Sequence, residues 1–280
     1  MKATKLSTII GFLERFAPLG LAEDWDNVGL LLGDRNAMIT SGITCLTVTP
    51  EVVDEAVESG ANLIVSHHPM PFQALKKITS DTVTGRMILK LCCHSIAVYS
   101  PHTAFDSTSS GINQMIAERV GLEQIQPLKM IDGWDQHSAN EDTSSEPVDT
   151  AVYGVGRQGT LPDSMTCQQL GDHLSKTFQI ESIKLCGSLE KSVKRIGVAC
   201  GSAGQFLSDA ARLGCDAFVT GETNFHTCLD AHARDVSLFL LGHYGSERFA
   251  VEQLASHLSG EFSELPFSPS SRERDPIQYI

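Results

Sequence analysis

Short apolar runs alternate with amphipathic stretches along this 280-residue chain, which predicts alternating strands and helices. Residues 43–49 (ITCLTVT) and 62–66 (NLIVS) are strand-like. The amphipathic stretch 50–60 between them has Pro50 in its first turn and Gly60 just past its end. Strands that are apolar throughout are typical of a sheet buried on both faces. This order of strand, helix and strand predicts an α/β fold.

Two parts of the chain resemble each other, one in each half. Residues 53–68 and 207–222 both give a helix, a glycine, a short apolar strand and then potential ligands. Further on, VYSPHTAFD (98–106) aligns with FLLGHYGSE (239–247), and an amphipathic stretch follows each. Two matches in the same order indicate an internal duplication. We therefore expect two similar α/β lobes that face each other and bring their strand ends into one cleft.

One segment, residues 131–149, differs in kind from both halves. It carries six acidic residues, is rich in serine and contains no Lys or Arg. That composition is typical of a flexible linker or surface insertion, and an acidic interaction segment or weak cation site is the alternative. The predicted organisation is an N-terminal α/β lobe over residues 1–130, an acidic linker over 131–149 and a C-terminal α/β lobe over 150–280.

The net charge is −13, from 21 Lys and Arg against 34 Asp and Glu. This acidity argues against a nucleic-acid-binding protein and against docking on an anionic membrane surface. No apolar run approaches the roughly 20 residues that cross a bilayer, and the N-terminal stretch lacks the features of a signal peptide. The eight cysteines form no C-x-x-C pair and mostly lie in apolar runs. They predict buried free thiols and a cytoplasmic location.

Potential metal ligands stand where predicted strands end. His67 and His68 follow one buried strand, His102 precedes Asp106 by four residues, and His243 precedes Glu247 by four. In α/β folds, ligands bind at the carboxyl ends of strands. Imidazole nitrogens and carboxylate oxygens together suit Zn, Fe, Mn or Co. Because a carboxylate can bridge two ions, this set predicts a dinuclear site, whereas any one residue alone would more often be a helix cap or a surface side chain.

Two further features bear on the chemistry. Neighbouring residues on a strand point to opposite faces, so His67 and His68 suit two different metals, or a strand end that Pro69 kinks. Glu222 stands at the matching strand end of the second half. A carboxylate beside a metal-bound water is a common proton acceptor, although a capping or salt-bridged role for Glu222 is equally open.

The stretch at residues 21–34 (LAEDWDNVGLLLGD) is unusually apolar for a loop. It predicts core positions for Trp25 and the leucines, with a turn at Asn27. The alternative is that Asp26 and its polar neighbours line a site. The glycine-containing run 201–204 could bring its backbone close to a phosphate, but it is too short to be specific.

Several motifs resemble the Nif-three-like dinuclear metal centre family, whose members include YbgI-type bacterial proteins and GTP cyclohydrolase I type 2 homologues. They are WDNVGLLLGD, SHHPMPF, SPHTAFD, TGETNFH, GHYGSE and the closing DPIQYI. The resemblance implies two similar α/β lobes, a two-metal site in the cleft between them and a ring-shaped homohexamer. It also implies roles for particular residues: metal ligation by His67, His68, Asp106, His243 and Glu247, and, for His102 and Glu222 near the metals, either support of the ligands or proton transfer.

The first functional hypothesis is a metal-dependent hydrolase that acts on a small molecule. Two divalent ions per chain (Zn, Fe, Mn or Co) would lower the pKa of a bridging water and make hydroxide available as the nucleophile. The reaction could open a purine-type ring, as in a cyclohydrolase, or hydrolyse a phosphoester or amide. Arg248, Lys76 and Lys77 could hold an anionic substrate, although solvated surface positions are the commoner case.

The alternative is a non-catalytic protein that uses the same ligands, such as a metal-binding scaffold, a metal-insertion factor or a protein-interaction partner. An open coordination position within reach of solvent would favour the hydrolase, and a closed site would favour the scaffold.

Overall fold

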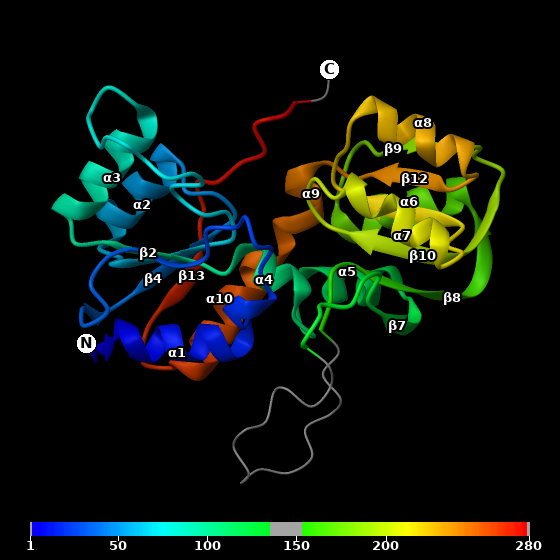
Figure 1. The fold of residues 1–280 in the computed structure, drawn as a ribbon. Coiled ribbons are helices and arrows are strands. Elements are labelled where there is room, and N and C mark those ends of the chain that lie inside the picture. The colour runs from blue at the N-terminus through cyan, green and yellow to red at the C-terminus, as the bar shows by residue number, and fades with distance from the viewer. Residues whose placement is uncertain (1, 135–152, 279–280) are drawn as a thin grey trace, which may run out of the picture. The chain divides into compact units, whose positions relative to one another are not determined.

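The computed structural model of the chain describes residues 2–134 and 153–278, which form two compact units. Unit 1 contains the described residues up to Phe105 together with Arg248–Gln278, and unit 2 is Asp106–Glu247 (Figure 1). The predicted boundaries after residues 130 and 149 therefore differ from those of the units. Of the acidic 131–149 segment, residues 135–149 lie outside the described part of the chain.

Unit 1 is built on a five-stranded sheet in the order β13-β4-β5-β6-β2. The first four strands are parallel, and β2 pairs antiparallel with β6 at the edge. The sheet strands are β2 (Gly29–Leu32), β4 (Gly42–Cys45), β5 (Leu63–Ser66), β6 (Ala97–Ser100) and β13 (Phe267–Pro269), and a separate antiparallel pair joins β1 (Thr4–Lys5) to β3 (Met38–Ile39).

Helices cover both faces of this sheet, with α1 and α10 on one face and α2 and α3 on the other (Figure 1). Side chains of β5 alternate between these layers, because Leu63 and Val65 pack towards α1 and α10 while Ile64 packs towards α2 and α3. The helices are α1 (Leu6–Phe16), α2 (Pro50–Ser59), α3 (Val83–Cys93), α4 (His102–Ser107) and α10 (Phe249–Glu261), with a short 3-10 turn at Leu19–Leu21. The predicted order of strand, helix and strand at 43–66 is confirmed, although the first strand ends at Cys45 and not at residue 49.

The C-terminal residues explain why the predicted second lobe was too long. Strand β13 pairs with β4, and the Thr44 hydroxyl donates to the Val251 carbonyl of α10 at 2.9 Å. Leu254 and Leu258 pack among the apolar side chains of α1. Residues 248–278 are thus part of the first unit's core, which a boundary placed at a polar linker does not reveal.

Unit 2 is built on a six-stranded sheet in the order β7-β8-β10-β11-β12-β9. Its three central strands, β10, β11 and β12, are parallel, and the other pairs are antiparallel. The strands are β7 (Glu123–Gln126), β8 (Arg157–Thr166), β9 (Lys184–Cys186), β10 (Ser192–Ala199), β11 (Ala217–Thr220) and β12 (Ser237–Leu240).

The helices of unit 2 also pack on its sheet. Phe218 and Leu238 lie in a buried cluster with Leu207 and Ala210 of α7 and with Ala231 of α8. The neighbouring Phe239 contributes to the other face, against α6. The helices are α5 (Ile112–Val120), α6 (Cys167–Phe178), α7 (Leu207–Arg212), α8 (Phe225–Ala233) and α9 (His243–Glu247), with a 3-10 turn at Gly204–Phe206.

The two sheets share one arrangement. Strands β4, β5 and β6 are parallel neighbours with antiparallel β2 beside the third, and β10, β11 and β12 are parallel neighbours with antiparallel β9 beside the third. These strands include the segments that match in the sequence, although the duplication itself stays a prediction.

Two predictions about the whole chain can be compared with this fold. No helix in residues 2–134 or 153–278 is long and apolar enough to span a membrane. All eight cysteines, which lie within the described residues, are free thiols, but only four are buried: Cys186 and Cys228 are half-buried, and Cys92 and Cys93 at the end of α3 are exposed.

Candidate metal centre

The two adjacent histidines of unit 1 follow the end of β5. The backbone N–H groups of His67 and His68 donate to the Cys45 and Leu46 carbonyls at 2.9 and 2.8 Å, so pairing with the neighbouring strand continues past Ser66. The Ser66 hydroxyl donates to the His68 carbonyl at 2.8 Å. The two rings lie 5.0 Å apart between centroids. Both imidazoles therefore face one region, and the choice between two metals and one at this pair stays a prediction.

His102 begins α4 at the end of the next strand, β6, and its backbone has φ +30°. This conformation is strained for a residue other than glycine and persists only where surrounding contacts hold it. The contacts come from Asp26, whose fully buried carboxylate lies 2.7 Å from His102 Nδ1. Asp26 also accepts from the Thr103 hydroxyl at 2.5 Å and from its backbone N–H at 3.2 Å. A carboxylate on Nδ1 orients the ring and leaves Nε2 for a metal or a proton.

The electrostatics of Asp26 fit this positioning role. Burial alone would raise the pKa of the Asp26 carboxyl, but the hydrogen bonds from His102 and Thr103 outweigh it and lower the pKa below its usual value. Asp26 is therefore held as a carboxylate beside His102. The predicted core position of Trp25 is wrong, whereas the alternative that Asp26 lines a site agrees with these contacts.

Three imidazoles of unit 1 offer ligand atoms to one point. Nitrogen atoms of His67, His68 and His102 all lie within 4.8 Å of one another, and the His102 ring lies 5.1 and 5.6 Å from the other two rings. Three neutral imidazoles are a common ligand set for Zn and related divalent ions. The donor set thus fits a transition-metal ion.

Exposed aromatic rings stand beside these histidines. Trp25 is 63% exposed and Phe72 is 53% exposed. Their rings lie 6.1 Å apart, and each ring lies 6.1 Å from the His102 ring. The Asn27 side-chain amide donates to the Pro71 carbonyl at 2.8 Å and ties together the two loops that carry them. Large rings left in solvent next to polar groups are typical of a ligand-contacting surface.

In unit 2, a single imidazole lies between two carboxylates. His243 Nε2 is 3.2 Å from Glu247, one turn later on α9, and His243 Nδ1 is 2.9 Å from Glu222, which follows β11. The hydrogen bond to Glu247 is the largest cause that raises the pKa of His243, to about 9, with a further contribution from Glu222 and against the effect of burial. A set with this much negative charge attracts a cation. Glu247 is buried, whereas Glu222 is half exposed.

Asp106 lies on α4, four residues after His102, and is held by the loop after β10. The Cys200 thiol donates to the Asp106 carboxylate at 3.2 Å, and the Cys200 N–H donates to the Asn113 side chain at 2.8 Å. Asn113 in turn donates to the Asp106 carbonyl at 3.1 Å. Burial, and then the charges of Asp106 and Glu247, raise the pKa of the Cys200 thiol well above its usual value. Cys200 therefore stays a thiol that can donate to a carboxylate.

The run at 201–204 has a role other than the suggested phosphate contact. Gly201 adopts φ +63°, and a Cβ atom at this position would overlap a Glu247 carboxylate oxygen. Its N–H donates to the Ser246 hydroxyl at 3.0 Å, and its carbonyl accepts from the Glu222 N–H at 2.9 Å. Only glycine allows the loop to come this close, so Gly201 lets Glu247 reach its position.

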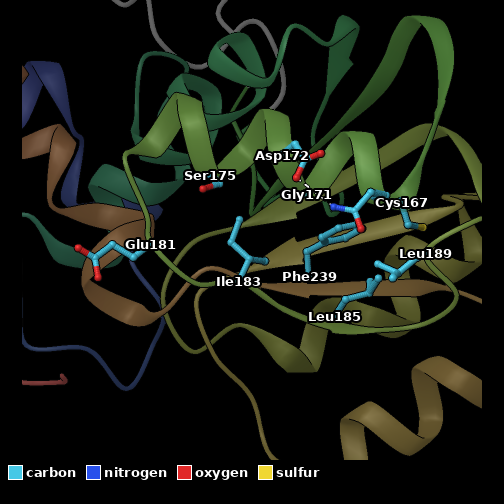
Figure 2. A pocket seen from close by; sticks show the side chains of 10 residues that line it. Cys167, Gly171, Asp172, Ser175, Glu181, Ile183, Leu185, Leu189 and Phe239 are labelled. Atoms are coloured by element: carbon cyan, nitrogen blue, oxygen red, sulfur yellow. Dashed lines mark hydrogen bonds between the residues drawn. The ribbon is translucent and has the colours of Figure 1, made fainter. Parts of the chain in front are cut away.

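A separate hollow of about 200 Å³ in unit 2 shares no residue with these clusters. Figure 2 shows that residues of α6 form one wall, while Leu185 and Phe239 contribute apolar side chains opposite. The Cys167 thiol at its edge is buried and donates to the Ser237 hydroxyl at 3.2 Å. The residues that line the hollow include no histidine and none of the predicted site residues, so the candidate chemistry remains at the strand ends.

The structure groups most predicted site residues within their own unit. His67, His68 and His102 lie together in unit 1, and Glu222, His243 and Glu247 lie together in unit 2. Sequence reasoning gave Asp26 only as an alternative and missed Thr47, whose hydroxyl lies 2.7 Å from His68 Nδ1. Asp26 lies in the WDNVG part of a motif that carries the family resemblance, so the sequence could have identified it as a site residue. Thr47 is a single threonine in a loop, and no sequence feature marks it.

Comparisons with known proteins identify the family of this chain. A sequence model of the Duf34/NIF3 (NGG1p interacting factor 3) family matches residues 4–276. A Clostridium acetobutylicum protein named GTP cyclohydrolase 1 type 2 homolog is 33% identical over 279 residues, which cover 98% of each chain.

Solved structures share the fold along the whole chain. A Staphylococcus aureus hypothetical protein is 29% identical and superposes with a TM-score of 0.85, covering 100% of each chain. A Bacillus cereus protein related to NIF3, at 22% identity, gives a TM-score of 0.87 with the same coverage, and at that identity it supports the fold alone. From the match to residues 4–276 and the full-length relative, we conclude that this chain belongs to the DUF34/NIF3 family.

Proposed function

We propose that this protein is a metal-dependent hydrolase with two divalent ions per chain, held by His67, His68, Asp106, His243 and Glu247. The observation that carries the proposal is the cluster of His67, His68 and His102 nitrogens within 4.8 Å. Carboxylates at the matching strand ends of unit 2 add the oxygen ligands that a second ion requires.

Bound ions would supply Lewis acidity and a lowered pKa for a coordinated water. The chain's own residues would move the proton. Glu222 is half exposed and hydrogen-bonded to His243 through one oxygen, so its carboxylate can accept a proton from solvent. His102 is fixed at Nδ1 by Asp26 and can exchange a proton only at Nε2.

The exposed rings of Trp25 and Phe72 favour a flat, cyclic substrate. They flank His102, where such a ring could stack beside the reacting groups. The name GTP cyclohydrolase 1 type 2 homolog, carried by the Clostridium relative, is consistent with ring opening. Titration with guanosine monophosphate should quench Trp25 fluorescence in a Trp134→Phe background. In that background Phe72→Ala should weaken binding about tenfold, and Ile78→Ala, which changes an exposed apolar residue of the same segment, should not. Calorimetry, which needs no tryptophan, should show a similar loss for Trp25→Ala.

One observation favours the non-catalytic alternative. His67 and Glu247 are only 2% and 3% exposed. Ligands this deeply buried suit a closed metal site, as in a scaffold or a metal-insertion factor.

Metal content is the first test. We expect about two ions per purified chain and a loss of one or both in His68→Ala and in Glu247→Ala. His94→Ala, which removes an exposed histidine outside the cluster, should retain both ions. Unchanged metal content in both ligand variants would contradict the assignment.

Turnover is the second test. Nucleotides, phosphoesters and cyclic amides would be assayed with Mn, Zn and Fe against a metal-stripped control. Hydrolysis by the loaded protein supports the hydrolase, and no hydrolysis by a protein that holds its metals supports the scaffold. The ring-shaped hexamer stays a prediction that light scattering can check.

A further inference from the structure

The C-terminal segment after β13 is tied into the loop that follows β4. The Glu273 side chain, which is 3% exposed, accepts from the backbone N–H groups of Leu46 at 2.9 Å and Thr47 at 2.6 Å. It also lies 3.1 Å from the Arg248 guanidinium. A buried carboxylate is stable only with such partners. The contacts with Leu46 and Thr47 span more than 220 residues of sequence and fix the backbone of residues 46 and 47.

That loop in turn contacts His68 at two points. The Leu46 carbonyl accepts from the His68 N–H at 2.8 Å, and the Thr47 hydroxyl lies 2.7 Å from His68 Nδ1. A hydrogen bond at Nδ1 fixes the plane of the imidazole and leaves Nε2 as its ligand atom. With Nε2 as the atom that would hold a metal, Nδ1 would carry the ring proton and donate it to the Thr47 hydroxyl.

We infer that Glu273 is a positioning residue for the metal centre, because it holds the 46–47 loop in place and Thr47 then orients the His68 ring. The inference rests on the proposed function in one respect, namely that His68 is a metal ligand. It gives the C-terminal segment, which lies far from the histidines in sequence, a role in metal affinity.

Other contacts hold Glu273 in turn. Glu55 of α2 accepts from the Ser270 hydroxyl at 2.5 Å and from the Ser271 N–H at 2.9 Å, and the Glu273 N–H donates to the Ser270 hydroxyl at 3.2 Å. Arg248 donates to the Ser270 carbonyl at 3.0 Å. The suggestion that Arg248 holds an anionic substrate therefore does not agree with the structure, since its guanidinium binds this segment.

The test compares Co²⁺ affinity among full-length variants. Thr47→Val keeps the shape of the side chain but removes the hydroxyl, and it should weaken Co²⁺ binding about 10–100-fold and change the visible absorption of the bound ion. Thr47→Ser restores the hydroxyl and should bind within about threefold of the wild type. Glu273→Gln should weaken binding in the same direction, and urea unfolding would verify that it is folded.

A matched control lies two residues along the chain. The Thr49 hydroxyl caps α2 by accepting from the Val52 N–H and does not contact His68. Thr49→Val should lower the urea midpoint while Co²⁺ affinity stays unchanged. Co²⁺ binding by Thr47→Val equal to that of the wild type would overturn the inference and leave the proposed function standing. A wild-type protein that binds no Co²⁺ would instead overturn the proposed function.

Discussion

The strand ends of the two units carry different ligands on matching strands. In unit 1, β5 is followed by His67 and His68, and in unit 2 the matching strand β11 is followed by Gly221 and Glu222. The next strand of each unit leads to a histidine, His102 or His243. Unit 1 thus collects three imidazoles, one of which is held by a buried aspartate, whereas unit 2 places one imidazole between two glutamates. The same arrangement of strands therefore carries mainly imidazole nitrogens in one unit and mainly carboxylate oxygens in the other.

The backbone turn that precedes the short helices α4 and α9, which begin at His102 and His243, also differs between the units. Unit 2 has Gly242 at φ +81° directly before His243, whereas in unit 1 the positive φ falls on His102 itself, after Pro101. Glycine adopts this conformation without strain and histidine does not. Consequently the strained backbone conformation of His102 depends on the contacts with Asp26, whereas at His243 the preceding glycine makes the turn without strain.

The largest expected difference in the free energy of unfolding therefore comes from removing the carboxylate partners of His102 and His243. Asp26→Ala removes a fully buried carboxylate with several donors and should lower the free energy of unfolding by about 3 kcal/mol. Glu222→Ala removes a half-exposed partner and should cost less than about 1 kcal/mol. Urea unfolding of the metal-free proteins measures both values. Equal losses would mean that the two histidines are held in the same way.

A smaller effect is expected at the loop beside Glu247. Gly201→Ala should lower the free energy of unfolding by about 2 kcal/mol, because φ is positive and Cβ would overlap Glu247. It should also weaken metal binding about tenfold. Gly214→Ala, at φ +75° with no atom within 4 Å of Cβ, should cost only about 1 kcal/mol and leave metal binding unchanged. Calorimetry with Zn²⁺ measures the metal affinity of the two variants. Equal losses of affinity in both would contradict the role of Gly201 in placing Glu247.

The last prediction concerns pH, and the stability contributions of the two units should be lost at opposite ends of the pH scale. The pKa of His243 is raised to about 9 from 6.5, so its contribution to stability is complete below pH 6.5 and is lost as pH rises through 9. The pKa of Asp26 is lowered, so its contribution is present above its usual pKa of 3.8 and is lost as pH falls through the lowered value.

NMR titration of the metal-free protein follows His243 directly. Glu247→Gln should bring the pKa of His243 back towards 6.5, because the hydrogen bond to Glu247 is the largest cause of the shift. A His243 pKa near 6.5 in the unmodified protein would show that the two glutamates do not hold its proton.

The sequence predicted much of the fold because the relevant signals are local. Continuous apolar runs gave β4 and β5, and Pro50 and Gly60 marked the ends of α2. The prediction that Trp25 lies in the core was wrong for the same reason. An aromatic residue in an apolar stretch predicts burial, whatever that stretch packs against in the folded protein. The structure leaves this ring in solvent because neither adjacent loop covers it.

By itself, the sequence determined the α/β class, the strand ends and the residue types that stand there. Each of these can be read from a stretch of a few consecutive residues, because hydrophobic periodicity and the polar residues after a strand are both local features. Only the tertiary structure decided which side chains orient those residues. Asp26 meets His102 across 76 positions, and Glu273 meets the Thr47 backbone across 226. Such contacts depend on how strands pair and where the chain's end returns, and no local pattern encodes them.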